Sequence, residues 1–166
     1  IRLSQIAADY GAEAAVSAPP YYFASAQPEL VEFYEQLVEA LPLPLFLYNM
    51  PTHTKVNFAP QTIRRIAENP KVIGFKDSSA NLVYFQSVMY VMSDRHDFSM
   101  LVGPEEVTGE SVLMGGNGGI NGGANMFPEL YVKLYNAAKE HNFEELYRIQ
   151  KIIMQISATI YTIGKY

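Results

Sequence analysis

The run Val72-Ile73-Gly74-Phe75-Lys76, which continues into Asp77-Ser78-Ser79, is the stretch that decides the fold. Its first four residues are apolar without alternation. That pattern predicts a strand covered on both faces, as in a parallel sheet, because a half-exposed strand would alternate apolar and polar residues. Similar short runs occur at residues 14–18, 45–49, 99–103 and 118–121, and each is followed by polar, aromatic or glycine residues.

Segments with helical periodicity separate these runs. Apolar spacing near 3.6 residues, with proline at the starts and glycine at the ends, predicts helices over residues 2–11, 28–40, 60–68, 81–92, 104–115, 128–141 and 143–163. Successive strands begin about 30 residues apart, which is the length of one strand–helix unit of a parallel sheet. The predicted class is therefore an α/β fold with a parallel sheet, in one domain over residues 1–166 without an internal boundary.

The composition excludes several classes of function. The chain has 12 Lys and Arg against 17 Asp and Glu, a formal charge of −5 without a basic cluster, so no nucleic acid or membrane partner is expected. Without cysteine there is no disulfide scaffold and no thiolate zinc site, and the three histidines show no metal spacing. The chain begins at Ile1 without a signal peptide, so we expect a cytoplasmic protein and a piece of a longer chain.

Lys76 is the most informative residue for chemistry, because the carboxyl ends of parallel strands carry the ligand site in such folds. Alternation along the strand places Val72, Gly74 and Lys76 on one face, with Ile73 and Phe75 packed against helices. Gly74 leaves room there for a small ligand or for the lysine stem. An ammonium that loses hydration in such a site yields the neutral amine that attacks a ketone and forms a Schiff base. For an isolated lysine, a side chain ending in solvent is the commoner arrangement.

Other strand ends offer candidates that also have structural explanations. Tyr48 ends the run at 45–49 and could shuttle a proton, although a lone tyrosine more often packs in the core. Tyr21 and Tyr22 follow two prolines and could be purely structural, and His53 lies in a polar loop. The glycines at 115–123 match neither dinucleotide-binding nor phosphate-loop spacing, so a phosphate-binding barrel enzyme is the weakest hypothesis.

Taken together, the strand ends resemble one family. The motifs Pro20-Tyr21-Tyr22, Tyr48-Asn49-Met50-Pro51, Gly74-Phe75-Lys76-Asp77, Gly103 and Gly118-Gly119-Ile120 occur in the same order in the dihydrodipicolinate synthase / N-acetylneuraminate lyase family. The similarity runs along essentially the whole chain. It implies a (β/α)8 TIM barrel of which this chain supplies strands four to eight, with the N-terminal part missing and the C-terminal helices cut short at Tyr166.

The resemblance also implies roles for particular residues. Lys76 corresponds to the Schiff-base lysine, Tyr48 to the tyrosine that shuttles protons, and Tyr22 to the tyrosine that reaches into a neighbouring subunit. The substrate-binding residues implied are Ile120, Gly103, Gly74 and His53. Family members act on pyruvate and an aldehyde, need no metal or organic cofactor because the Schiff base supplies the electron sink, and form homo-oligomers, so a tetramer or dimer is expected.

Two departures from the family pattern bear on the substrate. His53 stands where dihydrodipicolinate synthases carry an arginine, and Lys76 is followed by Asp77 where they usually carry glutamate. Both favour a 2-keto-3-deoxy sugar acid or sialic-acid-like substrate over aspartate semialdehyde, the substrate of dihydrodipicolinate synthase in lysine biosynthesis. A hypothesis of another class is an inactive barrel fragment or interaction remnant, because five strands cannot close a barrel.

Overall fold

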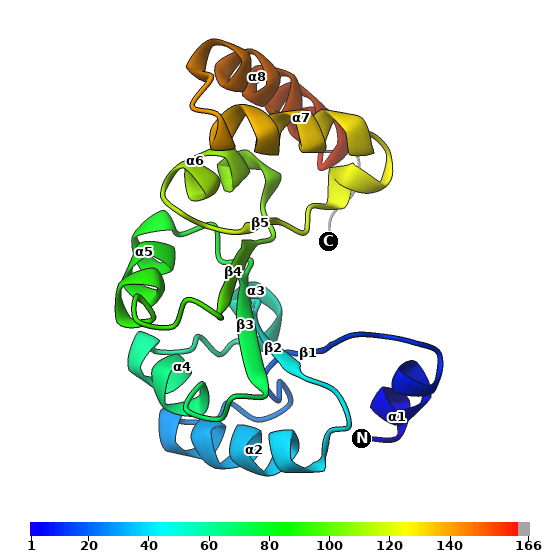
Figure 1. Cartoon of the computed structure of the whole chain (residues 1–166), viewed down its shortest axis with the longest axis vertical. Coiled ribbons are helices and arrows are strands. Elements are labelled where there is room, and N and C mark those ends of the chain that lie inside the picture. The colour runs from blue at the N-terminus through cyan, green and yellow to red at the C-terminus, as the bar shows by residue number, and fades with distance from the viewer. Residues whose placement is uncertain (163–166) are drawn as a thin grey trace. The chain divides into compact units, whose positions relative to one another are not determined.

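The computed structural model describes residues 1–162, in which strands and helices alternate as the sequence predicts (Figure 1). The strands are β1 (Ala15–Ser17), β2 (Leu45–Asn49), β3 (Val72–Asp77), β4 (Ser99–Val102) and β5 (Gly118–Gly119). The helices are α1 (Arg2–Asp9), α2 (Gln27–Ala40), α3 (Pro51–Thr54), α4 (Pro60–Ile66), α5 (Leu82–Val91), α6 (Thr108–Leu113), α7 (Pro128–Lys139) and α8 (Phe143–Ile160), with short 3-10 helices η1 (Glu105–Val107) and η2 (Gly122–Asn125).

Several details of the predicted elements differ. The helix expected over residues 104–115 is divided into η1 and α6, and the short helices α3 and η2 follow strands without having been predicted. Helix α8 ends at Ile160. The expected helix end at Ile163 and the expected cut at Tyr166 lie outside the described residues.

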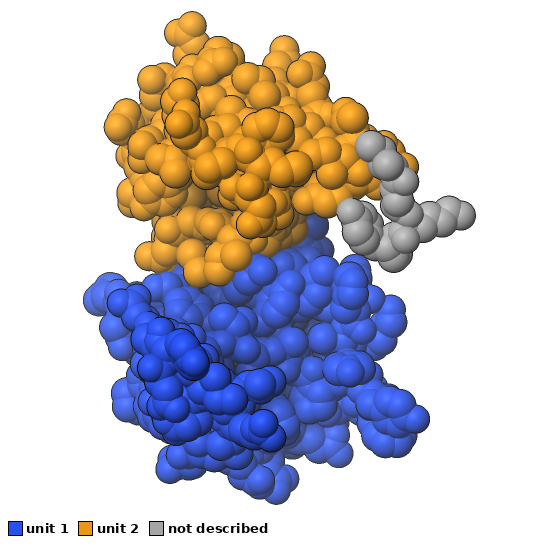
Figure 2. Space-filling view, turned by 90° about the vertical axis from the view of Figure 1, so that its right-hand side faces the viewer, with its two compact units in different colours: residues 1–100 blue, residues 101–166 orange. Residues whose placement is uncertain are grey.

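The chain divides into two compact units, residues 1–100 and residues 101–166, which Figure 2 shows in different colours. The expectation of a single domain stays a prediction. In the first unit, β1, β2 and β3 pair in parallel in that order. Helix α4 packs against both α2 and α5, and α1 stands apart from these helices (Figure 1). The parallel α/β class is confirmed.

The core of the first unit lies between the strands and the helices. Leu45 and Leu47 of β2 and Phe75 of β3 are fully buried. The Phe75 ring contacts the rings of Phe58 and Tyr84, with centroid distances of 6.3 and 6.2 Å. Phe75 therefore packs towards the helices, as its alternate position in the strand predicts.

The alternation expected along β3 is interrupted at Ile73. Val72 pairs with Leu45 and Gly74 with Phe46, so the register shifts by one residue between these pairs. A bulge of this kind places two residues of one strand opposite one residue of its partner. Val72 is consequently not in simple alternation with Gly74, and the predicted shared face holds only from Gly74 to Lys76.

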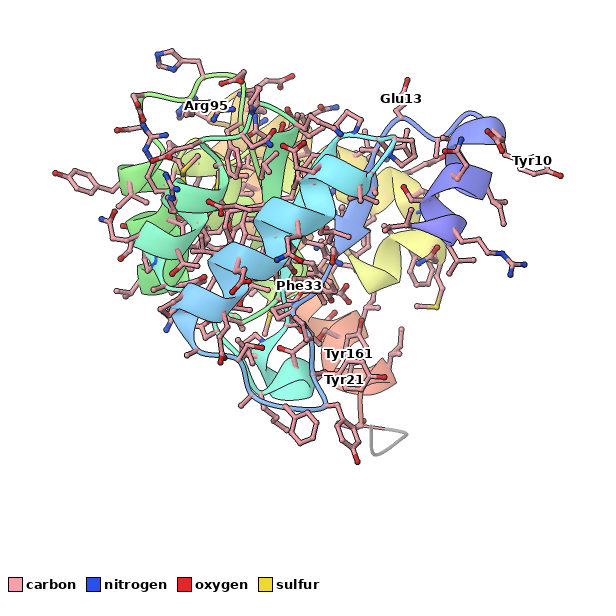
Figure 3. All side chains as sticks on the ribbon, turned by 90° about the horizontal axis from the view of Figure 1, so that it is seen from below. Tyr10, Glu13, Tyr21, Phe33, Arg95 and Tyr161 are labelled. Atoms are coloured by element: carbon pink, nitrogen blue, oxygen red, sulfur yellow. The ribbon has the colours of Figure 1, made fainter. Side chains whose placement is uncertain are left out.

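Helix α1 has a clear apolar side but buries none of its residues. Leu3 is 80% exposed, and Tyr10 projects away from the end of the helix at 89% exposure (Figure 3). The periodicity predicts this helix correctly. Within residues 1–162, however, its apolar side has no burial partner.

In the second unit, β4 and β5 pair in parallel. Helix α7 packs against α6 and α8, and Leu134, Ile149 and Ile153 are fully buried between them. Asn142 caps the N-terminus of α8, because its side chain accepts a hydrogen bond from the backbone N–H of Glu145. Leu146, Ile149 and Ile153 of the apolar face of this helix therefore belong to the core of the unit.

Candidate active site

Adjacent strands place Tyr48 and Lys76 side by side. The two residues are direct partners in the parallel register of β2 and β3, and both side chains are half-buried. The Lys76 Nζ lies 4.3 Å from the centroid of the Tyr48 ring. A cation in this position is attracted by the electron-rich ring face. The structure thus brings together the two residues that the sequence proposed for chemistry.

Gly74 has a different role from the one expected. Gly74 is paired with Phe46 in the register of β2 and β3, and a Cβ added to Gly74 would overlap the Phe46 ring. The space over this glycine is therefore filled by an aromatic side chain and is not open to a ligand or to the lysine stem. Glycine is required here because the ring lies directly on the backbone.

The opposite face of the same strand ends holds a buried polar network that the sequence analysis did not identify. Asn49 and Asp77 are paired in the register and only 0% and 2% exposed. Asn49 Nδ2 donates to Asp77 Oδ1 at 2.9 Å and to Asn57 Oδ1 at 2.8 Å. The sequence signals are that each polar residue directly follows a candidate catalytic residue and belongs to one of the motifs that carry the resemblance.

Burial controls the electrostatics of Asp77. Loss of hydration raises the pKa of the Asp77 carboxyl, and hydrogen bonds from Asn49 and Ser79 partly oppose that rise. Ser79 donates to it through both its hydroxyl, at 2.8 Å, and its backbone N–H, at 3.1 Å. Burial and the nearby Asp77 charge together raise the pKa of Tyr84, whose hydroxyl donates to the backbone oxygen of Phe58 at 2.8 Å.

His53 lies on the short helix α3, which leaves the end of β2. Proline at its first position favours this turn, and Lys55 ends it in the left-handed conformation with φ of 58°. The His53 side chain is exposed, and its Nδ1 lies 3.0 Å from Thr52 Oγ1. The imidazole is therefore accessible at the same strand end as Tyr48.

Tyr22 lies in the loop between β1 and α2. It is 85% exposed and meets Phe23 edge to face, with centroids 4.8 Å apart. Within residues 1–162, no hydrogen bond or ring contact joins Tyr22 to Lys76 or Tyr48. The tyrosine is available to another surface rather than built into the Lys76 site of its own chain.

In the second unit, Gly103 and Ile120 follow the paired strands β4 and β5. The Ile120 N–H donates to Val102 O at 2.8 Å, while the Ile120 side chain is 51% exposed. Asn121 Nδ2 donates to Gly103 O at 2.8 Å and to Thr108 Oγ1 at 2.9 Å. Asn121, which the sequence analysis missed, therefore holds the backbone at Gly103, while Val102 O holds the backbone at Ile120.

Glu105 is a second buried acid that sequence reasoning did not assign to a site. It is 2% exposed, and its Oε2 accepts a hydrogen bond from the Gly123 N–H at 3.0 Å. Burial raises the pKa of the Tyr131 hydroxyl, and the nearby Glu105 charge raises it further. This carboxylate ties the start of η1 to η2.

The part of the chain that the structure describes contains neither a candidate metal site nor a candidate membrane span. No group of three or more histidine, cysteine, aspartate or glutamate residues there is arranged to hold a metal ion. None of the helices described has both the length and the apolar character needed to cross a membrane.

The fold and the site define a class: a parallel α/β protein in which a lysine and a tyrosine lie together at the carboxyl ends of adjacent strands. The profile of the Dihydrodipicolinate synthetase family matches residues 1–165. The chain belongs to this family, which confirms the resemblance found in its motifs.

This chain matches only part of the length of each relative. A probable 2-dehydro-3-deoxy-D-pentonate aldolase of Escherichia coli is 33% identical over 160 residues, which are 95% of this chain and 53% of that protein. A 4-hydroxy-tetrahydrodipicolinate synthase of Methanococcus aeolicus is 31% identical over 162 residues, 97% of this chain and 55% of that protein. The chain thus spans about half the length of the curated relatives it matches.

Solved structures agree with this fold. A dihydrodipicolinate synthase from Bacteroides thetaiotaomicron superposes with a TM-score of 0.95 at 74% identity, covering 99% of this chain and 55% of that one. A 2-keto 3-deoxygluconate aldolase from Picrophilus torridus gives a TM-score of 0.88 at 28% identity, over 99% of this chain and 59% of that one. Coverage of this extent is consistent with a partial barrel.

Proposed function

We propose that the protein containing this chain is a class I aldolase or lyase that joins pyruvate to an aldehyde, or cleaves the product, through a Schiff base at Lys76. The observation that carries the proposal is the Lys76 Nζ, 4.3 Å from the Tyr48 ring centroid at the ends of paired strands, in a chain of this family. Assigning β1 to β5 as strands four to eight of a barrel belongs to the same proposal.

The chemistry begins with the neutral Lys76 amine. Its lone pair attacks the ketone carbon of pyruvate, and loss of water leaves an iminium. The iminium draws electrons from the adjacent methyl group, which loses a proton and becomes the nucleophilic carbon of an enamine. That carbon bonds to the aldehyde carbon, the aldehyde oxygen takes a proton, and water releases the product and the free amine. The reverse sequence cleaves the same bond without a metal or organic cofactor.

Tyr48 would serve this sequence in two ways. Its ring faces the Lys76 Nζ in the structure, and it would face the positively charged iminium that forms at the same nitrogen. Its hydroxyl would carry protons to and from the reacting oxygens. Because β2 places Tyr48 directly opposite Lys76, no rearrangement of the strands is needed to bring the two groups together.

The remaining pocket residues belong to the proposal as well. His53 would meet the aldehyde, and Ile120 and Gly103 would line the pyruvate pocket with their backbones. Tyr22 would enter the site of a neighbouring copy, an assignment supported by its exposed position. The proposal accordingly includes a homo-oligomer, a tetramer or dimer, and a cytoplasmic location.

We favour a 2-keto-3-deoxy sugar acid or a sialic-acid-like compound as the substrate. Exposed His53 offers a single imidazole where a guanidinium would grip a second carboxylate with paired hydrogen bonds. Similarity to a probable 2-dehydro-3-deoxy-D-pentonate aldolase supports the same class.

Dihydrodipicolinate synthase is the second candidate. The observation in its favour is the 74% identity to the solved Bacteroides thetaiotaomicron protein of that name. A panel of aldehydes would separate the two candidates: condensation of pyruvate with aspartate semialdehyde alone would establish the second, and condensation with hydroxylated aldehydes the first.

The proposal is tested by trapping the Schiff base in the protein expressed from its complete gene. Incubation with pyruvate and borohydride is followed by intact-mass measurement and peptide mapping. One reduced pyruvate on Lys76 is expected, with none in Lys76→Ala. The matched control is Lys151→Ala, an exposed lysine on α8, which should be labelled like the wild type. A folded wild type without any adduct would favour the inactive remnant instead.

A further inference from the structure

The buried Asn49 and Asp77 side chains lie directly behind the proposed catalytic pair. Each follows its catalytic neighbour by one residue, and the two are partners in the register, as are Tyr48 and Lys76. Successive residues of a strand point to opposite faces. A bond between the side chains at 49 and 77 therefore acts on the same backbone segments that carry the side chains at 48 and 76.

Both polar atoms of the Asn49 side chain are hydrogen-bonded. Its two amide hydrogens go to Asp77 Oδ1 at 2.9 Å and Asn57 Oδ1 at 2.8 Å, and its Oδ1 accepts the Phe58 N–H at 3.4 Å. Asp77 in turn accepts from Asn49 and twice from Ser79. Such complete pairing at full burial is unlike a surface contact, because any partner removed leaves a buried polar group unsatisfied.

The pair also lies where the backbone ladder ends. Strands β2 and β3 stop at Asn49 and Asp77, and the Ser78 N–H donates to Asn49 O at 2.8 Å just beyond them. After that point the chain turns into α3 on one side and towards α5 on the other. A side-chain bond at this place adds to the last backbone bond between the two strand ends.

We infer that Asn49 and Asp77 form a positioning pair that keeps the Tyr48 ring and the Lys76 amine in reacting geometry. This role rests on the proposed function. Neither residue touches the substrate, since both lie on the helix-facing side of the sheet with Leu47 and Phe75. The Asn49 side chain also bonds Asn57 and the Phe58 N–H, in the segment that follows α3. The positioning pair therefore also holds the end of the segment that carries His53.

The test compares variants by steady-state kinetics and by the rate of borohydride trapping in the complete protein. Asn49→Leu keeps the approximate volume and removes the bonds. We expect kcat and the trapping rate to fall roughly 10- to 100-fold, the cost of displacing reacting groups by about 1 Å, with KM for pyruvate changed less than about threefold. Asp77→Asn, which still offers a side-chain oxygen to Asn49, should keep most of the wild-type kcat and trapping rate. Asn136→Leu, on the exposed side of α7, is the matched control and should behave as wild type.

Folding of the variants is controlled separately. If Asn49→Leu does not fold, the double variant Asn49→Leu/Asp77→Leu removes both polar partners and so leaves no unpaired carboxylate. The same loss of kcat is expected from it. Wild-type kcat in either folded variant would overturn the positioning role, whereas a wild type that forms no adduct would overturn the proposed function itself.

Discussion

Replacing Gly74 by alanine tests the packing directly beside the proposed lysine. The added Cβ would occupy space held by the Phe46 ring, which lies opposite Gly74 in the register of β2 and β3. The ring cannot move far without changing its rotamer or shifting the strand. Overpacking of this kind costs about 1–3 kcal/mol. The free energy of unfolding of Gly74→Ala should fall by that amount.

A second substitution shows whether the ring is the cause. Phe46→Leu removes ring atoms from a half-buried position and should cost about 1 kcal/mol. If the clash accounts for the first effect, the double variant should be about as stable as Phe46→Leu alone, a coupling of about 1–3 kcal/mol. The assay is urea unfolding of all four proteins, with equal m-values required for the comparison.

Either of two results would refute this account. Gly74→Ala within about 0.5 kcal/mol of wild type would mean that the ring yields freely. Additive effects in the double variant would mean that the added methyl meets something other than Phe46. The first of these results would restore support for open space over Gly74, as the sequence suggested.

Three further outcomes are expected. Tyr48→Phe should keep the cation–ring contact and the pyruvate adduct but lower kcat, and undiminished turnover in a steady-state assay would remove the proton-shuttle role. The pKa of the Asp77 carboxyl in the folded chain lies above the ordinary 3.8, so the folded chain holds this proton more tightly than the unfolded chain does. The free energy of unfolding of the wild type, relative to that of Asp77→Asn, should therefore decline as pH rises from about 4 through the raised pKa. A difference in urea unfolding that stays constant with pH would contradict this. Light scattering of the complete protein should show a dimer or tetramer, and a uniform monomer would argue against Tyr22 serving a neighbouring site.

The order of elements could be predicted because hydrophobic periodicity is a local property. The apolar run ending at Lys76 and the stripe through Ile149 and Ile153 each point to one kind of element, and the structure contains both. The short helices α3 and η2 were missed because a single turn is too short for a periodic pattern.

The candidate site could be predicted in part, for a related reason. Lys76 and Tyr48 stand out as polar residues that end apolar strands, and such ends meet at one edge of a parallel sheet. Their direct pairing could not be predicted, since strand register depends on residues far apart in the chain. The bulge at Ile73 shows this dependence, because no local pattern indicates where the register shifts.

By itself, then, the sequence determined the α/β class, the parallel strands and the lysine and tyrosine at their ends, because short apolar runs, helical periodicity and polar strand ends are local patterns. Only the tertiary structure decided that Phe46 fills the space over Gly74 and that Asn49 binds Asp77 behind the candidate pair. Both are contacts between strands separated by more than 20 residues. Side-chain partners at that separation are selected by register and burial, which exist only once the strands have come together.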